Sequence, residues 1–64
     1  MQFILQNVRK SKNITQKQLA EETNLSVSYI QKLETGNRKK PSYESVICIA
    51  AALKVKPEEL FLSE

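Results

Sequence analysis

The sequence predicts an all-α fold, a compact bundle of five short helices that forms a single domain over residues 1–64. A chain of 64 residues has room for only one small hydrophobic core. Its composition, 41% hydrophobic with one Gly and two Pro, is typical of a helical domain and not of a sheet or a disordered tail. Apolar residues also recur at helical spacing between capping and turn residues.

A short turn separates the first two expected helices. The first covers about residues 2–12, and Asn13 follows it as a left-handed cap. Thr15 then stands at an N-cap position, and Gln18, three residues later, completes a capping box. The second helix therefore begins after Thr15 and runs to about Thr23.

Residues 16–35 have the pattern of a helix-turn-helix unit. Ser26 is the N-cap of the third helix, which runs to about Glu34. Asn24 lies at the turn, where the backbone needs a positive φ that Asn tolerates well. Ala20 is small enough to let the two helices cross closely. Four residues of the third helix face outwards: Val27, Ser28, Gln31 and Lys32.

The fourth and fifth helices follow a cationic loop over residues 37–41. Ser42 caps the fourth helix, and Pro57 suits the first position of the fifth. Apolar residues of the fourth helix recur at the spacing i, i+3, i+4, i+7: Val46, Ile49, Ala50 and Leu53. After Pro57, we expect Leu60 and Phe61 to fold back on the core.

Charge is divided unevenly along the chain. Residues 1–40 contain eight Lys or Arg and three Glu, which gives a net charge of +5. Residues 41–64 contain two Lys and four Glu, which gives a net charge of −2. The basic part contains the helix-turn-helix pattern. This distribution favours an anionic partner on that side of the molecule.

The inventory of side chains argues against an enzyme. The sequence has no His and no Asp, and its single cysteine, Cys48, has no imidazole to activate it. The same shortage leaves no ligand set for a metal, and we expect no cofactor and no small-molecule ligand. No apolar run reaches the roughly 18 residues that span a membrane, and no signal-peptide pattern is present. We therefore expect a cytoplasmic protein.

The run ITQKQLAEETNLSVSYIQKLETG, residues 14–36, resembles the helix-turn-helix of XRE-type regulators, the family of lambdoid phage repressors and Cro. The resemblance extends to Pro41 and Ser42 and to the ending over residues 52–61, so it covers nearly the whole chain. It implies a lambda repressor-like bundle in which the second and third helices bind DNA. Asn24 stands where the family usually has Gly.

The resemblance implies that Val27, Ser28 and Lys32 read base edges in the major groove. Lys suits the O6 and N7 acceptors of guanine, Ser pairs with several bases, and Val packs on a thymine methyl group. A β-branched apolar side chain such as Val27, exposed at a helix start, favours a groove over solvent.

A second set of residues is expected to contact the DNA backbone. Gln16 begins the second helix, where its amide and the free backbone N–H groups suit a phosphate. The cations that follow the third helix suit phosphates as well. Tyr29 has the alternative of covering the edge of the core. The full set is Gln16, Ser26, Tyr29, Thr35, Asn37, Arg38, Lys39 and Lys40.

Two further groups serve other purposes. The resemblance implies a structural ion pair between Arg9 and Glu34. Several apolar residues lie off the inner face of the fourth helix or near the chain end, and they either form a contact for a second subunit or partner or are a lightly covered surface. These residues are Ile47, Cys48, Ala51, Phe61 and Leu62.

The sequence thus predicts a sequence-specific, double-stranded DNA-binding transcriptional regulator, of bacterial or phage origin and a repressor by resemblance. We expect a homodimer on a palindromic operator, with recognition helices about 34 Å apart. The alternative is a protein-interaction or antitoxin-like regulatory module that uses the exposed face of the fourth helix.

Overall fold

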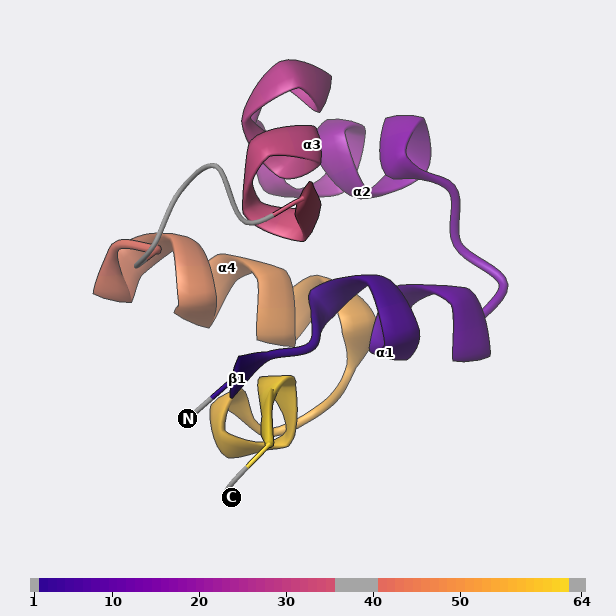
Figure 1. Ribbon diagram of the computed structural model, residues 1–64. Helices are drawn as coiled ribbons and strands as arrows, with labels where there is room; N and C mark the ends of the chain where they lie inside the picture. The colour runs from indigo at the N-terminus through magenta and orange to yellow at the C-terminus, as the bar shows by residue number, and fades with distance from the viewer. Residues whose placement is uncertain (1, 36–40, 63–64) are drawn as a thin grey trace.

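Helices make up most of the structure, a computed structural model that describes residues 2–35 and 41–62. In chain order its elements are β1 (Gln2–Phe3), α1 (Leu5–Ser11), α2 (Gln16–Thr23), α3 (Val27–Thr35), α4 (Tyr43–Leu53), the 3₁₀ helix η1 (Pro57–Leu60) and β2 (Phe61–Leu62). The all-α class predicted from the sequence is confirmed. Helix α4 crosses the middle of the molecule, with α2 packed on one side of it and η1 on another (Figure 1).

The two ends of the described chain pair as a small antiparallel ribbon, which the sequence analysis did not predict. Gln2 pairs with Leu62, and Phe3 pairs with Phe61. The rings of Phe3 and Phe61 also lie against each other, with their centroids 5.1 Å apart. The first helix consequently begins at Leu5 and not at residue 2, because the preceding residues are extended in the ribbon.

The last helical segment also differs from its prediction. It is a single 3₁₀ segment, Pro57–Leu60, and not an α-helix, since Phe61 leaves it directly into β2. The carboxylate of Glu59 accepts a hydrogen bond of 2.7 Å from the backbone N–H of Lys56, which closes the start of the segment. Leu60 is fully buried, as predicted, so the short segment still adds an apolar side chain to the core.

The predicted caps and turns of the helix-turn-helix unit are confirmed. The Thr15 hydroxyl accepts a bond of 3.0 Å from the Gln18 N–H, and the Gln18 side-chain oxygen accepts one of 2.9 Å from the Thr15 N–H. Ser26 Oγ accepts from the N–H of Tyr29 at 3.0 Å. Asn24 has a φ of 63°, the left-handed conformation predicted for the turn between α2 and α3.

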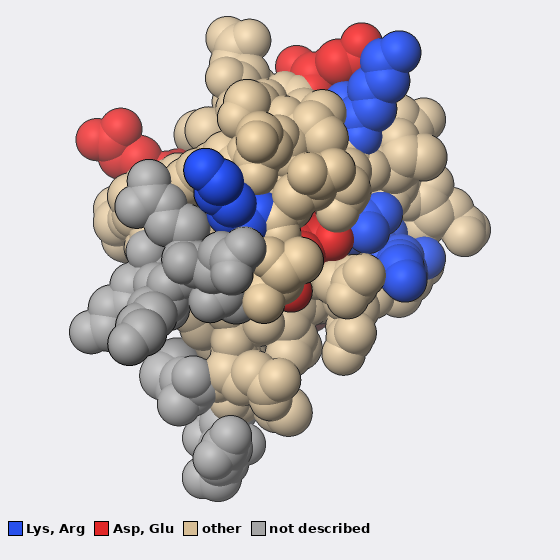
Figure 2. Space-filling view, turned by 45° about the horizontal axis from the view of Figure 1, so that its top comes forward, with Lys and Arg blue, Asp and Glu red and all other residues tan. Residues whose placement is uncertain are grey.

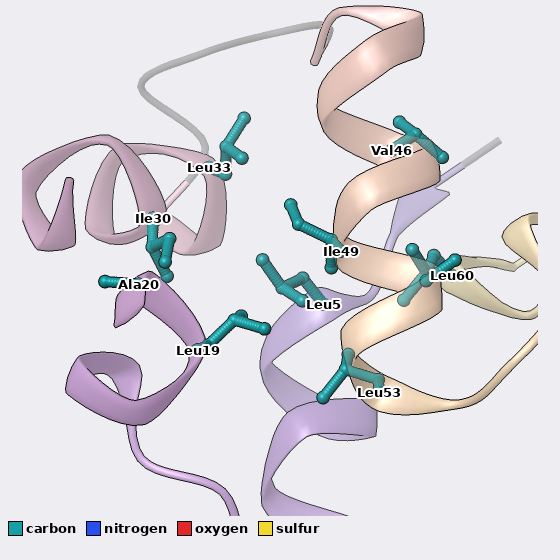
Figure 3. Close-up of a cluster of buried hydrophobic side chains, with 10 residues drawn as sticks. Leu5, Leu19, Ala20, Ile30, Leu33, Val46, Ile49, Leu53 and Leu60 are labelled. Carbon is teal, nitrogen blue, oxygen red and sulfur yellow. The ribbon is translucent and has the colours of Figure 1, made fainter. Parts of the chain in front are cut away.

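One hydrophobic core joins all the helices (Figure 3). Leu5 projects from α1 toward Leu19 of α2 and Ile49 of α4. The buried apolar residues are Leu5, Leu19, Ala20, Ile30, Leu33, Val46, Ile49, Ala50, Leu53 and Leu60. Each helix therefore presents one apolar face inward, and this packing fixes the position of α3 relative to the rest of the molecule.

Candidate nucleic-acid interface

Helix α3 lies on the outside of the bundle, anchored from behind by two buried side chains. Ile30 and Leu33 are 0% and 3% exposed and fix the inner face of the helix. Ala20 of α2 is 7% exposed, which agrees with the close approach of the two helices that its small size predicts. The opposite face of α3 is left for solvent or a partner.

The three residues expected to read bases differ in their surroundings. Ser28 and Lys32 are exposed and lie four residues apart, so they share one face of α3. Val27 is half-buried and packs against the hydrophobic core. The expectation that Val27 is an exposed apolar side chain is therefore only partly met, because contact with the core accounts for part of its apolar character. Its role in reading a base stays a prediction.

Arg9 and Glu34 lie together in the interior, between α1 and the end of α3. Arg9 Nε lies 2.6 Å from Glu34 Oε2, and Arg9 Nη2 lies 3.1 Å from Oε1. The arginine also donates from Nη1 to the carbonyl oxygen of Ile14 at 2.7 Å. The side chains of Arg9 and Glu34 are only 9% and 2% exposed, so this bidentate ion pair is shielded from solvent. It ties α1, the following turn and α3 into one unit.

Gln16, at the first position of α2, connects that pair to the surface of α3. Its Nε2 donates to Glu34 Oε1 at 2.9 Å, and its Oε1 accepts from Nε2 of Gln31 at 3.4 Å. Gln16 itself is half-buried, whereas Gln31 is exposed. Helical spacing predicts that Gln31 lies on the outer face of the helix, but it assigns no role to this residue. Its spacing, four residues after Val27 and three after Ser28, was the available signal.

Tyr29 joins α3 to α4 instead of standing free on the surface. It is half-buried against the core, and its hydroxyl donates to Ser45 Oγ at 3.0 Å. Ser45 is itself buried and also accepts from the hydroxyl of Ser42, the N-cap of α4, at 2.8 Å. These contacts favour the alternative in which Tyr29 covers the edge of the core. Ser45 could not be predicted from the sequence, because a serine within an apolar helix carries no distinctive pattern.

The remaining candidates for the DNA backbone are divided between described and undescribed residues. Ser26 and Thr35 are exposed at the two ends of α3. Asn37, Arg38, Lys39 and Lys40 lie outside the described residues. Figure 2 shows the top of the molecule, where α2 and α3 lie, brought forward: most of its described surface is uncharged, and in two places a blue side chain lies directly beside a red one.

A second exposed region lies on α4. Ile47 is 37% exposed, and Cys48 and Ala51 are exposed. The latter two border a shallow hollow, whose lining residues are Glu22, Thr23, Cys48, Ala51, Ala52 and Lys54. The other two partner candidates lie elsewhere, in the terminal ribbon, where Phe61 contacts Phe3 and Leu62 is 52% exposed.

Two kinds of feature are absent from the described part of the chain. Among residues 2–35 and 41–62, no group of three or more His, Cys, Asp or Glu side chains is arranged to hold a metal ion. Within the same ranges, no helix has the length and apolar character that crossing a membrane requires.

Comparison with known proteins identifies the family. The family described as helix-turn-helix matches residues 5–60, which is most of the chain and includes all four α-helices of the structure described above. The chain belongs to the helix-turn-helix family. This agrees with the resemblance to XRE-type regulators on which the sequence analysis relied.

Proteins similar to this chain include a curated relative and a protein of known structure. The HTH-type transcriptional activator BcrR of Enterococcus faecalis is 42% identical over 60 residues, which are 94% of this chain. The chain spans only 29% of the length of BcrR. The restriction-modification controller protein C.AhdI of Aeromonas hydrophila is 35% identical, with a TM-score of 0.83 over 89% of this chain and 85% of that protein.

Proposed function

We propose that this chain is the DNA-binding domain of a transcription regulator and that α3 enters the major groove of double-stranded DNA. The observation that carries the proposal is the outer face of α3, where Ser28 and Lys32 stand exposed on a helix whose inner face is fully anchored. An α-helix held in this way has the dimensions that the major groove accepts.

The relatives support regulation of transcription as the purpose of this binding. BcrR is named as a transcriptional activator, and C.AhdI is named as a controller of restriction and modification. The resemblance to lambdoid repressors favours repression, whereas the name of BcrR favours activation. The proposal is accordingly made for a regulator, and the direction of regulation depends on where its site lies relative to a promoter.

The test is a selection of bound sequences from random double-stranded DNA, followed by affinity measurements on the enriched site. We expect one enriched motif, and we expect Lys32→Ala to weaken binding to it by about 1–3 kcal/mol while relaxing the preference at one base. Lys56→Ala is the matched control, because it removes an equal charge from an exposed residue at the start of η1. No enriched motif, or equal losses in the two variants, contradicts the proposal.

We further propose that the protein binds a palindromic site as a homodimer through the exposed face of α4. Ile47, Cys48 and Ala51 supply exposed apolar surface there. Glu22 and Lys54, which carry opposite charges, line the hollow that Cys48 and Ala51 border. A surface that carries a positive and a negative side chain can be complementary to the same surface of a second subunit, because a two-fold axis can bring the positive group of each subunit near the negative group of the other.

The oligomeric state of Ala51→Glu tests the dimer, because the new carboxylate would be buried in the interface. Sedimentation analysis is expected to show a dimer for the unchanged chain and a monomer for this variant. Ser11→Glu, at an exposed position of α1, is the control and is expected to remain dimeric. A monomeric unchanged chain contradicts the homodimer. A normal dimer in Ala51→Glu contradicts this choice of face.

A further inference from the structure

Gln31 is an exposed residue of α3 whose side-chain amide already has one partner. It lies on the face that Ser28 and Lys32 occupy, three residues after the first and one before the second. Its Nε2 donates a hydrogen bond of 3.4 Å to Oε1 of Gln16. An exposed glutamine would otherwise sample many rotamers, so a defined partner restricts the directions in which its amide points.

The orientation of both amides follows from the buried ion pair. Glu34 is a carboxylate that binds Arg9, so it can only accept, and the group of Gln16 that faces it must be the N–H donor Nε2. Oε1 of Gln16 therefore faces the other way, and only a donor can meet it. Gln31 must turn its own Nε2 toward Gln16. The charge of Glu34 thus fixes the orientation of the Gln31 amide, with its Nε2 toward Gln16.

We propose that Gln31 reads an adenine in the major groove and that Gln16 is the positioning residue that holds its amide in the adenine-reading orientation. This inference rests on the proposed function, since it requires α3 to lie in the groove. Nε2 of Gln31 has a second N–H, and its Oε1 is an acceptor, so one donor and one acceptor remain for a base edge. Adenine offers the complementary pair, its N7 acceptor and N6 donor.

The fixed orientation gives discrimination that a free glutamine lacks. Guanine presents two acceptors in the groove, N7 and O6. A free amide can rotate to bring its NH₂ group between them, but the bond to Gln16 disfavours that rotation in Gln31. The Gln31 oxygen would then oppose guanine O6 without a proton between them, which costs free energy because both groups lose hydrogen bonds to water.

The first experiment compares the sequences selected by the unchanged chain, by Gln31→Ala and by Gln6→Ala. Gln6 is an exposed glutamine on α1 and serves as the matched control. We expect the unchanged chain and Gln6→Ala to prefer adenine at one position of the motif, and Gln31→Ala to lose this preference. The affinity of Gln31→Ala for the wild-type site is expected to be about 5- to 150-fold lower than that of the unchanged chain. Equal weakening on all sequences, with the motif unchanged, would make Gln31 a phosphate contact and overturn the proposal.

The second experiment tests the positioning role through a double-mutant cycle of Gln16→Ala and Gln31→Ala, measured on the selected site and on the same site with that adenine changed to guanine. Gln16→Ala is expected to reduce the adenine preference of Gln31 by about 2-fold or more, and to have no such effect when Gln31 is already Ala. Thermal denaturation of each variant confirms that the compared proteins are folded. An adenine preference that Gln16→Ala leaves intact overturns the positioning role.

These outcomes separate the inference from the function on which it rests. If the unchanged chain enriches no motif, the proposed function itself fails. If the chain enriches a motif and Gln31→Ala retains every preference in it, the proposed function stands and the role of Gln31 fails.

Discussion

Arg9 Nε and Glu34 Oε2 lie 2.6 Å apart, in a buried contact that joins residues 25 positions apart in the sequence. The same carboxylate also accepts from Gln16. One glutamate near the end of α3 thus fixes α1, the start of α2 and the orientation of a side chain on the outer face. The interior polar contact and the candidate DNA surface are parts of one network.

Removing one partner of this pair is expected to destabilise the protein more than removing both. Arg9→Met or Glu34→Leu alone leaves a buried charge without its counter-ion and should lower the free energy of unfolding by about 3–5 kcal/mol. The double variant replaces the pair with apolar groups and should lose less than either single variant. Urea denaturation of the three variants measures this. Additive losses would contradict a pair whose members depend on each other.

The contribution of η1 to the stability of the core can be measured by comparing two leucines that are close in sequence. Leu60 is 0% exposed and Leu62 is 52% exposed. Leu60→Ala should lower the free energy of unfolding by about 2–5 kcal/mol because it leaves a cavity in the core. Leu62→Ala should change the same free energy by about 0.5 kcal/mol or less. Similar losses in thermal denaturation would mean that the short 3₁₀ segment does not pack as described.

Lys54 is expected to be replaceable by glycine with a gain in stability. Its φ is 59°, a left-handed conformation in which a Cβ atom is unfavourable, and it ends α4. Lys54→Gly should raise the free energy of unfolding by about 0.5–1 kcal/mol after the added flexibility of the unfolded chain is included. Asn13 has a φ of 58° and tolerates it better, so Asn13→Gly is the control with a smaller gain. Destabilisation by Lys54→Gly in urea denaturation contradicts this expectation.

Tyr29→Phe distinguishes a structural from a DNA-contacting hydroxyl. Removing the hydroxyl breaks the bond to Ser45 and should lower the free energy of unfolding by about 0.5–1.5 kcal/mol. At a temperature where the variant is folded, we expect its affinity for the selected DNA site to equal that of the unchanged chain. A clear loss of affinity with normal stability would instead assign the hydroxyl to the DNA backbone.

The parts of the fold predicted from the sequence are those governed by neighbours along the chain. The capping box of Thr15 and Gln18, the left-handed Asn24 and the buried face of α4 each depend on residues within about two helical turns. The terminal ribbon was missed because Phe3 and Phe61 belong to opposite ends of the chain and only the folded core brings them together.

The candidate site divides in the same way. The sequence by itself determined that α3 is an outward-facing helix and which of its residues share a face, because helical spacing is a local property. Only the tertiary structure decided that Val27 packs against the core and that the Tyr29 hydroxyl donates a hydrogen bond to Ser45. Tertiary packing alone also aligned Gln31 with Gln16 and Glu34, since the partners of a side chain depend on how separate helices pack.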